Sequence, residues 1–274
     1  AHALTRQFDL LVVRGGRAER YIRDFGGTNR IERITGSVEM PERCPPVSER
    51  DIDVIFVGRL TERKRPDRFI KVMAEVAREH PEVRAALVGD GPDTDDLKRQ
   101  VAELGIEANV EFLGLRSDVL DLNLKSRIFA LTSRWEGVSI AMLEAMSCGT
   151  IPVVSDVGDL RVVVDSGDNG FVFDEDDLDS FAATISALLA DESRMTELSQ
   201  AARATVEDRC SREAVTRRWR ATFRSMQVVD GPFSSAAAAE LLHCRNCAVR
   251  PREGAAVSAR LTAQVQACDL WKLE

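Results

Sequence analysis

The chain has 274 residues, of which 44% are hydrophobic and 30% are charged, a composition typical of a soluble globular protein. Its formal net charge of -8 argues against broad nucleic-acid binding, which needs a basic face. No apolar run approaches the roughly 20 residues that span a bilayer, and the first residues lack the pattern of a signal peptide. The six scattered cysteines are typical of reduced thiols, so we predict a cytoplasmic protein.

The first 46 residues predict too little structure for an independent domain. Residues 9–13 read as one strand and 16–24 as one helix, and the chain then runs extended to Pro46. One strand and one helix cannot build a core of their own. We therefore interpret residues 1–46 as the remnant of an N-terminal domain, whose beginning is absent, together with a linker.

Between residues 47 and 228, short apolar runs alternate with stretches of helical period. The first run, 53–58, is rich in β-branched residues and ends in glycine, as buried parallel strands do. Further strands are expected at 84–88, 109–113, 127–131, 150–154 and 171–173. Helices are expected from Pro66 to Ala77, around Leu97 to Leu104, at 140–146, 177–190 and 192–208, and from Val215 to Met226. This alternation predicts an α/β fold with a doubly wound parallel, Rossmann-like sheet. Residues 229–274 show no repeating unit and read as helix plus coil.

In such a sheet, ligands bind beyond the carboxyl ends of the strands, and the loop that follows the first strand carries suitable residues. Gly58 lets the backbone approach a ligand. Arg59 and Lys64 stand at the two ends of a short loop, from which both side chains could reach a diphosphate. A solvated basic loop is the alternative interpretation. After the next strand, Gly89 and Gly91 form a Gly-x-Gly pair that can cradle phosphate, although a plain tight turn explains it better.

The segment from Ser133 to Met146 is the most specific of these features. Glu136 and Gly137 lie in a loop, and Ser139 is placed to cap the helix that follows. The free amides of residues 138–141 would then form an anion site. Glu144 lies inside this apolar helix, where a carboxylate is costly without a partner, and a pair of ribose hydroxyls would be such a partner. The alternative is that Glu144 pairs with an arginine and that Glu136 is simply an acid of the first turn.

These motifs follow one another in an order that resembles a known family. The order is Gly-Arg-Leu-x-x-x-Lys (58–64), Val-Gly-Asp-Gly-Pro (88–92), Phe-Leu-Gly (112–114), the segment 133–150, Pro-Val-Val-Ser-Asp-Val-Gly-Asp (152–159) and Gly-x-Asn-Gly (167–170). It resembles the C-terminal, donor-binding domain of a group 1 (family 4) retaining glycosyltransferase of GT-B architecture, over about residues 50–228. Residues 9–46 resemble the end of that family's N-terminal acceptor domain and its linker, with Thr-Gly-Ser-Val-Glu (35–39) where the family has Pro-Asn-Gly-Val-Asp.

The resemblance implies a sugar transfer from a nucleotide-diphosphate sugar with retention of configuration, as by a hexosyltransferase. By similarity, Arg59 and Lys64 neutralise the donor diphosphate, Glu136 faces the sugar hydroxyls and Glu144 holds the ribose. The other substrate-binding positions implied are Gly58, Gly114, Leu115, Gly137, Val138, Ser139 and Ile140. No cofactor or metal is expected, and the acceptor is not identified. Peripheral membrane contact is left open for the missing domain.

Three rival interpretations stay open. A truncated module that binds nucleotide sugar without transferring it is the strongest, because most of the N-terminal domain is absent and the residues after 228 show no pattern. In addition, none of His2, His80 and His243 matches the histidine of the family's N-terminal domain. A nucleotide-sugar epimerase of the same fold is the second. The third is a zinc site at Cys244 and Cys247 with His243 and Cys268, for which ordinary thiols are the better interpretation.

Overall fold

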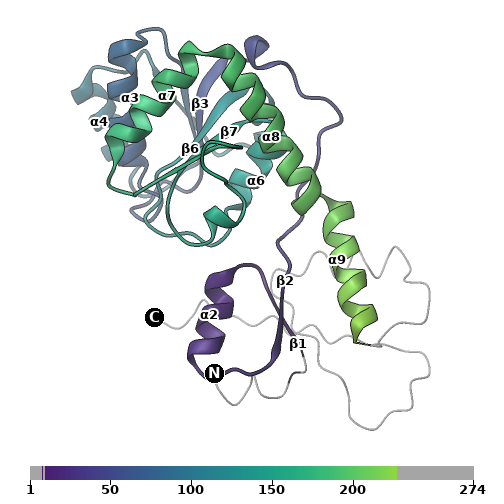
Figure 1. The fold of residues 1–274 in the computed structure, drawn as a ribbon. Coiled ribbons are helices and arrows are strands. Elements are labelled where there is room, and N and C mark those ends of the chain that lie inside the picture. Colours follow the sequence, from purple (N-terminus) through teal and green to yellow (C-terminus); the bar gives the residue numbers. More distant parts are fainter. Residues whose placement is uncertain (1–7, 9, 227–274) are drawn as a thin grey trace. The chain divides into compact units, whose positions relative to one another are not determined.

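The computed structural model describes residue 8 and residues 10–226 (Figure 1). Contacts divide the chain into two compact units, one from Val38 to Ser211 and one that joins the residues before it to those after it. The domain limits expected from the sequence, at 46 and 228, stay a prediction. The tail 229–274 and its cysteine and histidine cluster lie outside the described residues.

The larger unit is built on one six-stranded parallel sheet, as the sequence predicts. Its strands stand in the order β5-β4-β3-β6-β7-β8. Their bounds are β3 Ile52–Val57, β4 Ala85–Val88, β5 Val110–Gly114, β6 Ser126–Leu131, β7 Ile151–Ser155 and β8 Phe171–Phe173. Each differs from its expected range by one residue at most at either end. The order reverses between β3 and β6, which are neighbours at the centre, and this is where a doubly wound sheet opens a crevice for ligands.

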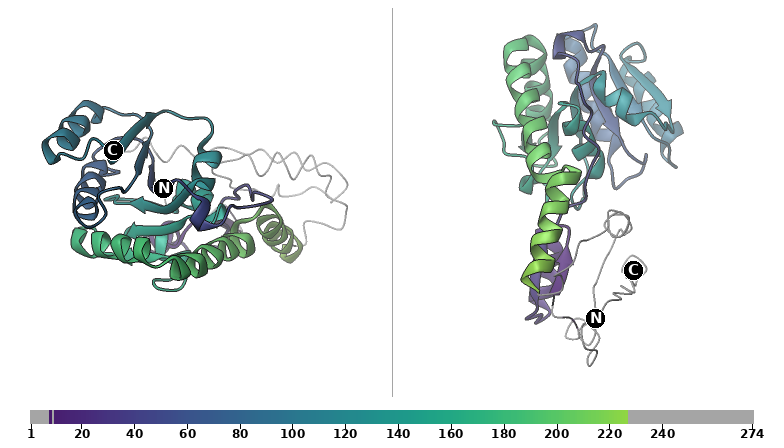
Figure 2. Two further views of the ribbon diagram at one scale, coloured as in Figure 1. Left: turned by 90° about the horizontal axis from the view of Figure 1, so that it is seen from above. Right: turned by 90° about the vertical axis from the view of Figure 1, so that its right-hand side faces the viewer.

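Helices cover this sheet in two groups of neighbouring helices, and one further pair of consecutive helices connects the groups (Figure 1). One group joins α3 (Pro66–Glu79) to α4 (Thr94–Leu104) and α7 (Leu178–Ala190). The other joins α6 (Ile140–Ser147) to α5 (Val119–Leu124) and to α8 (Glu192–Cys210). Figure 2 shows the sheet from two further directions, with the long helix α8 beside it. Short 3-10 turns at Val47–Glu49 and Leu160–Val162 complete the unit.

The core lies between the sheet and the helices. Strand residues such as Val54, Ile55 and Phe56 are fully buried, since both faces of a parallel sheet are covered. In α3 the expected apolar stripe is buried, with Phe69, Ile70, Met73 and Val76 all at zero exposure. In α4 the stripe ends sooner than expected, because Leu104 is 42% exposed.

Arg50 is a buried cation at the amino edge of the sheet. Its guanidinium donates to the carbonyls of Pro45, Ser126, Cys148 and Gly149 at 2.8–3.2 Å. Burial lowers its pKa. Two of these carbonyls, those of Cys148 and Gly149, lie just after the last residue of helix α6. Arg50 therefore places positive charge at the negative end of the helix dipole. One side chain therefore joins the segment before β3 to β6 and α6.

The smaller unit contains two parallel strands and two helices among its described residues. Strand β1 (Leu10–Val13) pairs with β2 (Arg30–Arg33), and α2 (Gly16–Asp24) connects them. The helix has the bounds that the sequence predicts, whereas β2 lies in a stretch expected only to be extended. Helix α9 (Arg212–Ser225) belongs to the same unit. Its Val215 and Phe223 are buried and Trp219 is half-buried, in agreement with the expected stripe.

Candidate functional site

The loop after β3 is fixed to its neighbours by backbone hydrogen bonds. Gly58 N–H donates to the Val88 carbonyl at 2.9 Å, and Leu60 N–H donates to that of Asp90 at 3.0 Å. At its far end Arg65 has a φ of 49°, a left-handed conformation that costs a non-glycine residue about 1 kcal/mol or more. The Thr132 hydroxyl donates to the Arg65 carbonyl at 2.8 Å and so ties the loop to the end of β6. The loop is thus a rigid support for Lys64.

Lys64 and Glu136 form a buried ion pair across two loops that follow adjacent strands. The Lys64 ammonium donates to Glu136 Oε1 at 2.5 Å, and the Ser133 hydroxyl donates to the same oxygen at 2.8 Å. The side chains are only 13% and 6% exposed. Breaking such a pair is costly because it leaves a charge without compensation. The structure therefore brings these two predicted site residues together, with one carboxylate oxygen of Glu136 held by both donors.

The glycines after β4 are required by close packing of two loops. A Cβ on Gly89 would lie 1.9 Å from the Gly58 carbonyl oxygen, and one on Gly91 would lie 2.0 Å from that of Leu60. Gly89 also has a φ of +138°, which favours glycine. The tight-turn interpretation of this Gly-x-Gly pair accounts for both residues. Its effect on the site is indirect, because it lets the β4 loop support the β3 loop.

Helix α6 presents a capped amino end to an open space. The Ser139 side chain accepts a hydrogen bond from Met142 N–H at 3.4 Å, which confirms the expected N-cap. A Cβ on Gly137 would meet no atom within 4 Å, so the space in front of it is open. From behind, Gly158 packs so closely that its Cβ would lie 2.1 Å from the Glu136 carbonyl oxygen. In the described part of the chain, no backbone acceptor takes the amides of residues 138–141, and these include Val138 and Ile140. Such an end attracts anions.

Glu144 lies on α6, one turn beyond its capped end. It is half-buried, and its carboxylate makes no hydrogen bond or ion pair with any described residue. Burial raises its pKa above the ordinary value. The arginine that the alternative interpretation requires is therefore not found among residues 8 and 10–226. A half-buried carboxylate without a partner is costly, and a ligand that donates hydrogen bonds would offset this cost.

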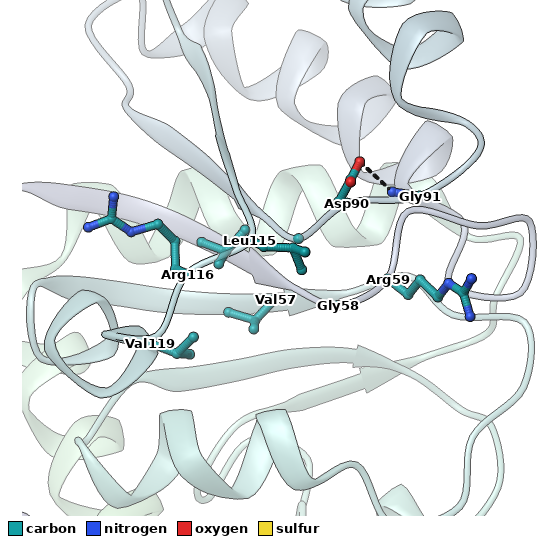
Figure 3. A pocket seen from close by; sticks show the side chains of 10 residues that line it. Val57, Gly58, Arg59, Asp90, Gly91, Leu115, Arg116 and Val119 are labelled. Carbon is teal, nitrogen blue, oxygen red and sulfur yellow. Dashed lines mark hydrogen bonds between the residues drawn. The ribbon is translucent and has the colours of Figure 1, made fainter.

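A cavity of about 460 Å³ opens at the carboxyl ends of β3, β4 and β5 (Figure 3). Its apolar wall includes Val57, Val119 and Leu115, and Leu115 is 80% exposed. Gly114, just before it, has a φ of +65°, and its carbonyl accepts from Gly89 N–H at 2.8 Å. The remaining lining residues are Gly58, Arg59, Val88, Gly89, Asp90, Gly91 and Arg116. The cavity thus adds an apolar surface to the anion-binding features of the site.

Two arginines line this cavity, and they differ in whether their guanidinium is paired with an acid. Arg116 donates to both carboxylate oxygens of Asp118, at 2.8 and 2.6 Å. These hydrogen bonds raise the pKa of Arg116 and lower that of Asp118. Arg59 is exposed and pairs with no described residue. In Figure 3 the two side chains extend in opposite directions. Arg59 therefore keeps its charge available for a ligand anion.

Sequence reasoning missed the part of the cavity that α5 provides. Arg116 and Val119 line it beside the predicted Gly114 and Leu115, yet neither was assigned to the site. The only signal was the exposed hydrophobic position after Phe-Leu-Gly. In the described residues no group of three or more histidine, cysteine or acidic side chains is arranged to hold a metal ion. None of the described helices has the length and apolar character needed to cross a membrane.

Comparisons with known proteins identify the family of this chain. The family model described as "Glycosyl transferases group 1" matches residues 43–205. Among curated relatives, the lipopolysaccharide core biosynthesis glycosyltransferase LpsE of Rhizobium meliloti is 30% identical over 72% of this chain and 55% of its own length. The D-inositol 3-phosphate glycosyltransferase of Rhodococcus jostii is 28% identical over 66% of this chain and 44% of its own length. The chain therefore spans about half the length of the relatives it matches.

A solved structure supports the fold. Anabaena Alr3699/HepE, crystallised in complex with UDP and glucose, superposes with a TM-score of 0.70 at 24% identity. The match covers 79% of this chain and 63% of that chain. At this identity the likeness shows the fold alone, which is one Rossmann-like domain of the GT-B architecture together with its flanking elements.

Proposed function

Because the chain belongs to the group 1 glycosyl transferases, we propose that the unit Val38–Ser211 binds a nucleotide-diphosphate sugar. In this proposal it is the donor half of an enzyme that transfers a hexosyl group with retention of configuration. Transfer by the whole protein is part of the proposal, since the chain spans about half the length of its curated relatives.

One observation carries the proposal. The same helix, α6, has an open anion site at its amino end and an acid, Glu144, that has no partner among the described residues. The amino end of α6 offers free amides in front of Gly137, where the helix dipole favours negative charge. On the same helix, Glu144 is half-buried and has no partner among the described residues. A diphosphate joined to a ribose supplies both missing partners, because it carries an anion and two neighbouring hydroxyl donors.

The rest of the donor fits the surrounding surfaces. We assign the diphosphate to the amides of α6 and to Arg59 and Lys64, which supply positive charge on the β3 loop. We assign the base to the cavity, where Val57, Leu115 and Val119 offer an apolar wall to a planar ring. Of the remaining proposed positions, Gly58 lets the backbone approach the donor, and Gly114 positions Leu115.

The proposed chemistry is electrostatic. As the bond between sugar and phosphate breaks, negative charge gathers on the departing diphosphate, and fixed positive groups stabilise it most in that state. The Lys64 ammonium is held in place by Glu136 rather than free in solvent, so little reorganisation is needed. Glu136 keeps its other carboxylate oxygen, Oε2, for a hydroxyl of the donor sugar. None of the groups assigned here acts as a covalent nucleophile.

The alternative functions predict other products from the same site. A truncated module would bind the donor and transfer nothing to any acceptor, and an epimerase would release an isomer of the free nucleotide sugar.

A calorimetric screen of UDP, GDP and ADP and of their sugars against the 274-residue chain tests the proposal. We expect one nucleotide class to bind, and Glu144→Ala to weaken it by about tenfold or more, as for the loss of hydrogen bonds to a charged group. The control is Glu103→Ala, which removes an exposed acid of α4 and leaves binding unchanged. Unchanged binding in Glu144→Ala would contradict the assignment of the ribose, and no binding of any nucleotide would contradict the proposed function.

A further inference from the structure

The two compact units of this acidic chain carry opposite charge. The unit Val38–Ser211 has 20 lysines and arginines against 35 acidic residues, a net charge of -15. The described residues of the other unit include eleven arginines and four acidic residues, a net charge of +7. Because the formal charge of the whole chain is -8, this separation cannot be seen in the overall composition. The smaller unit is therefore basic, although the chain as a whole is acidic.

Much of this charge lies on one helix. Helix α9 carries five exposed arginines and a single acid, Glu213. The arginines are Arg212, Arg217, Arg218, Arg220 and Arg224. None of their side chains makes a hydrogen bond or an ion pair with another described residue, in contrast to those of Arg30 and Arg33 of β2, which pair with acids. Arg217, Arg220 and Arg224 are spaced three and four residues apart, so they share one face of the helix. We call these three residues the arginine stripe.

The other face of α9 is already occupied. Ala214, Val215, Thr222 and Phe223 are buried. The ring of Trp219 is half-buried and stacks on that of Phe223, with 5.5 Å between their centroids. The apolar face of α9 is therefore covered, and the arginine stripe lies on its exposed face. Any contact through the arginine stripe is a surface contact driven by charge.

Exposed aromatic side chains occur in the same unit. On α2 and directly after it, Tyr21 and Phe25 are 54% and 48% exposed, and their ring centroids lie 4.5 Å apart. Arg17 and Arg20 are exposed on the same helix. Aromatic rings and arginines are the side chains that gather where a membrane meets water.

We propose that the arginine stripe docks this protein on an anionic phospholipid surface. Lipid phosphates match the forked donors of arginine, and a flat charged surface suits three arginines on one face of a helix. Added salt screens such an attraction, because the Debye length is about 10 Å at ordinary ionic strength. The proposal does not depend on the donor site, which lies wholly within Val38–Ser211.

Sedimentation with lipid vesicles tests the proposal on the full chain. We expect binding to phosphatidylcholine vesicles that contain phosphatidylglycerol, little binding to phosphatidylcholine alone, and release as salt is added. Each arginine near an anionic surface changes the partition coefficient about fivefold. The triple variant Arg217→Gln, Arg220→Gln and Arg224→Gln should therefore bind roughly a hundredfold more weakly. Glutamine keeps the helix propensity close to that of arginine, so the fold is preserved.

The matched control removes the same charge from the other unit. It replaces the exposed Arg78, Arg84 and Arg99 by glutamine and should bind vesicles as the unchanged chain does. Circular dichroism and nucleotide binding show separately that each variant is folded. Equal losses in the two triple variants, or equal binding to neutral and anionic vesicles, would overturn the proposal. Binding to a DNA duplex without binding to vesicles would assign the stripe to nucleic acid and would also overturn it.

Discussion

Glu144 shows how a single side chain can connect folding to ligand binding. It is half-buried on α6, burial raises its pKa, and no described residue compensates its charge. Compared with the unfolded chain, the folded and unliganded protein therefore favours the protonated form of Glu144. This preference stabilises the fold below the ordinary glutamate pKa of about 4.3, and the contribution is lost as the pH rises through the raised pKa.

A donor whose hydroxyls bind the Glu144 carboxylate prefers the ionised form, so the pH dependence of binding is the opposite of that of stability. We predict that nucleotide affinity rises as the pH increases through the raised pKa of Glu144. Glu144→Gln should remove this rise. Calorimetric titrations over the acidic range measure it, and Glu103→Gln keeps the profile and so corrects for the titration of the nucleotide itself. An identical profile in the two variants would contradict the role of Glu144.

The Lys64–Glu136 pair should stabilise the fold as well as the site. Because the side chains are only 13% and 6% exposed, Lys64→Met leaves a carboxylate nearly without water, at a cost of roughly 3 kcal/mol in unfolding free energy. Adding Glu136→Gln to Lys64→Met should recover part of this loss. Urea denaturation of the single and double variants measures both effects.

An exposed ion pair provides the comparison for the Lys64 and Glu136 variants. Arg78 and Glu75, on α3, are 73% and 48% exposed, so Arg78→Met should cost less than about 1 kcal/mol. If Lys64→Met cost no more than Arg78→Met, the ion pair would not be a buried one in solution.

At the scale of elements, variants of two glycines distinguish residues that support the fold of the site from residues that contact the donor. A Cβ on Gly89 would lie 1.9 Å from the Gly58 carbonyl oxygen, at a φ that only glycine adopts easily, so Gly89→Ala should destabilise the fold by roughly 2 kcal/mol or more. A Cβ on Gly137 meets no protein atom within 4 Å, so Gly137→Ala should leave stability unchanged and weaken nucleotide binding. Denaturation and calorimetry on both variants distinguish the effects. Full affinity in Gly137→Ala would show that the donor does not approach that amide.

The elements that the sequence analysis missed are the short ones. Helix α5 has six residues, too few for a helical period to stand out, and it closes one side of the cavity. Strand β2 consists of Arg-Ile-Glu-Arg, which lacks the apolar run of a buried strand and becomes a strand by pairing with β1. A longer helix such as α3, with 14 residues, could be predicted because apolar residues recur along it at helical spacing.

At the scale of the whole molecule, the proposed donor site is confined to one of the two compact units. We predict that nucleotide slows amide hydrogen exchange in the loops after β3 and β4 and at the start of α6, and leaves residues 10–33 unchanged. Mass spectrometry of peptides with and without nucleotide measures this. Protection of residues 10–33 would show that the donor site extends into the other unit.

The sequence by itself determined the alternation of strands and helices, the cap at Ser139 and the loops that carry Arg59, Lys64 and Glu136. These are local properties, since periodicity, capping and turn chemistry depend on neighbours along the chain. They were enough to predict the sheet and to locate the loops of the candidate site.

The tertiary structure alone decided which of these loops meet. Lys64 and Glu136 are 72 residues apart in sequence and pair because β3 lies beside β6, an order that alternation does not fix. In the same way, Arg50 finds carbonyls up to 99 residues away, and Leu115 becomes the wall of a cavity only beside Gly58 and Val119. Contacts of this kind depend on the packing of distant segments, which no local pattern encodes.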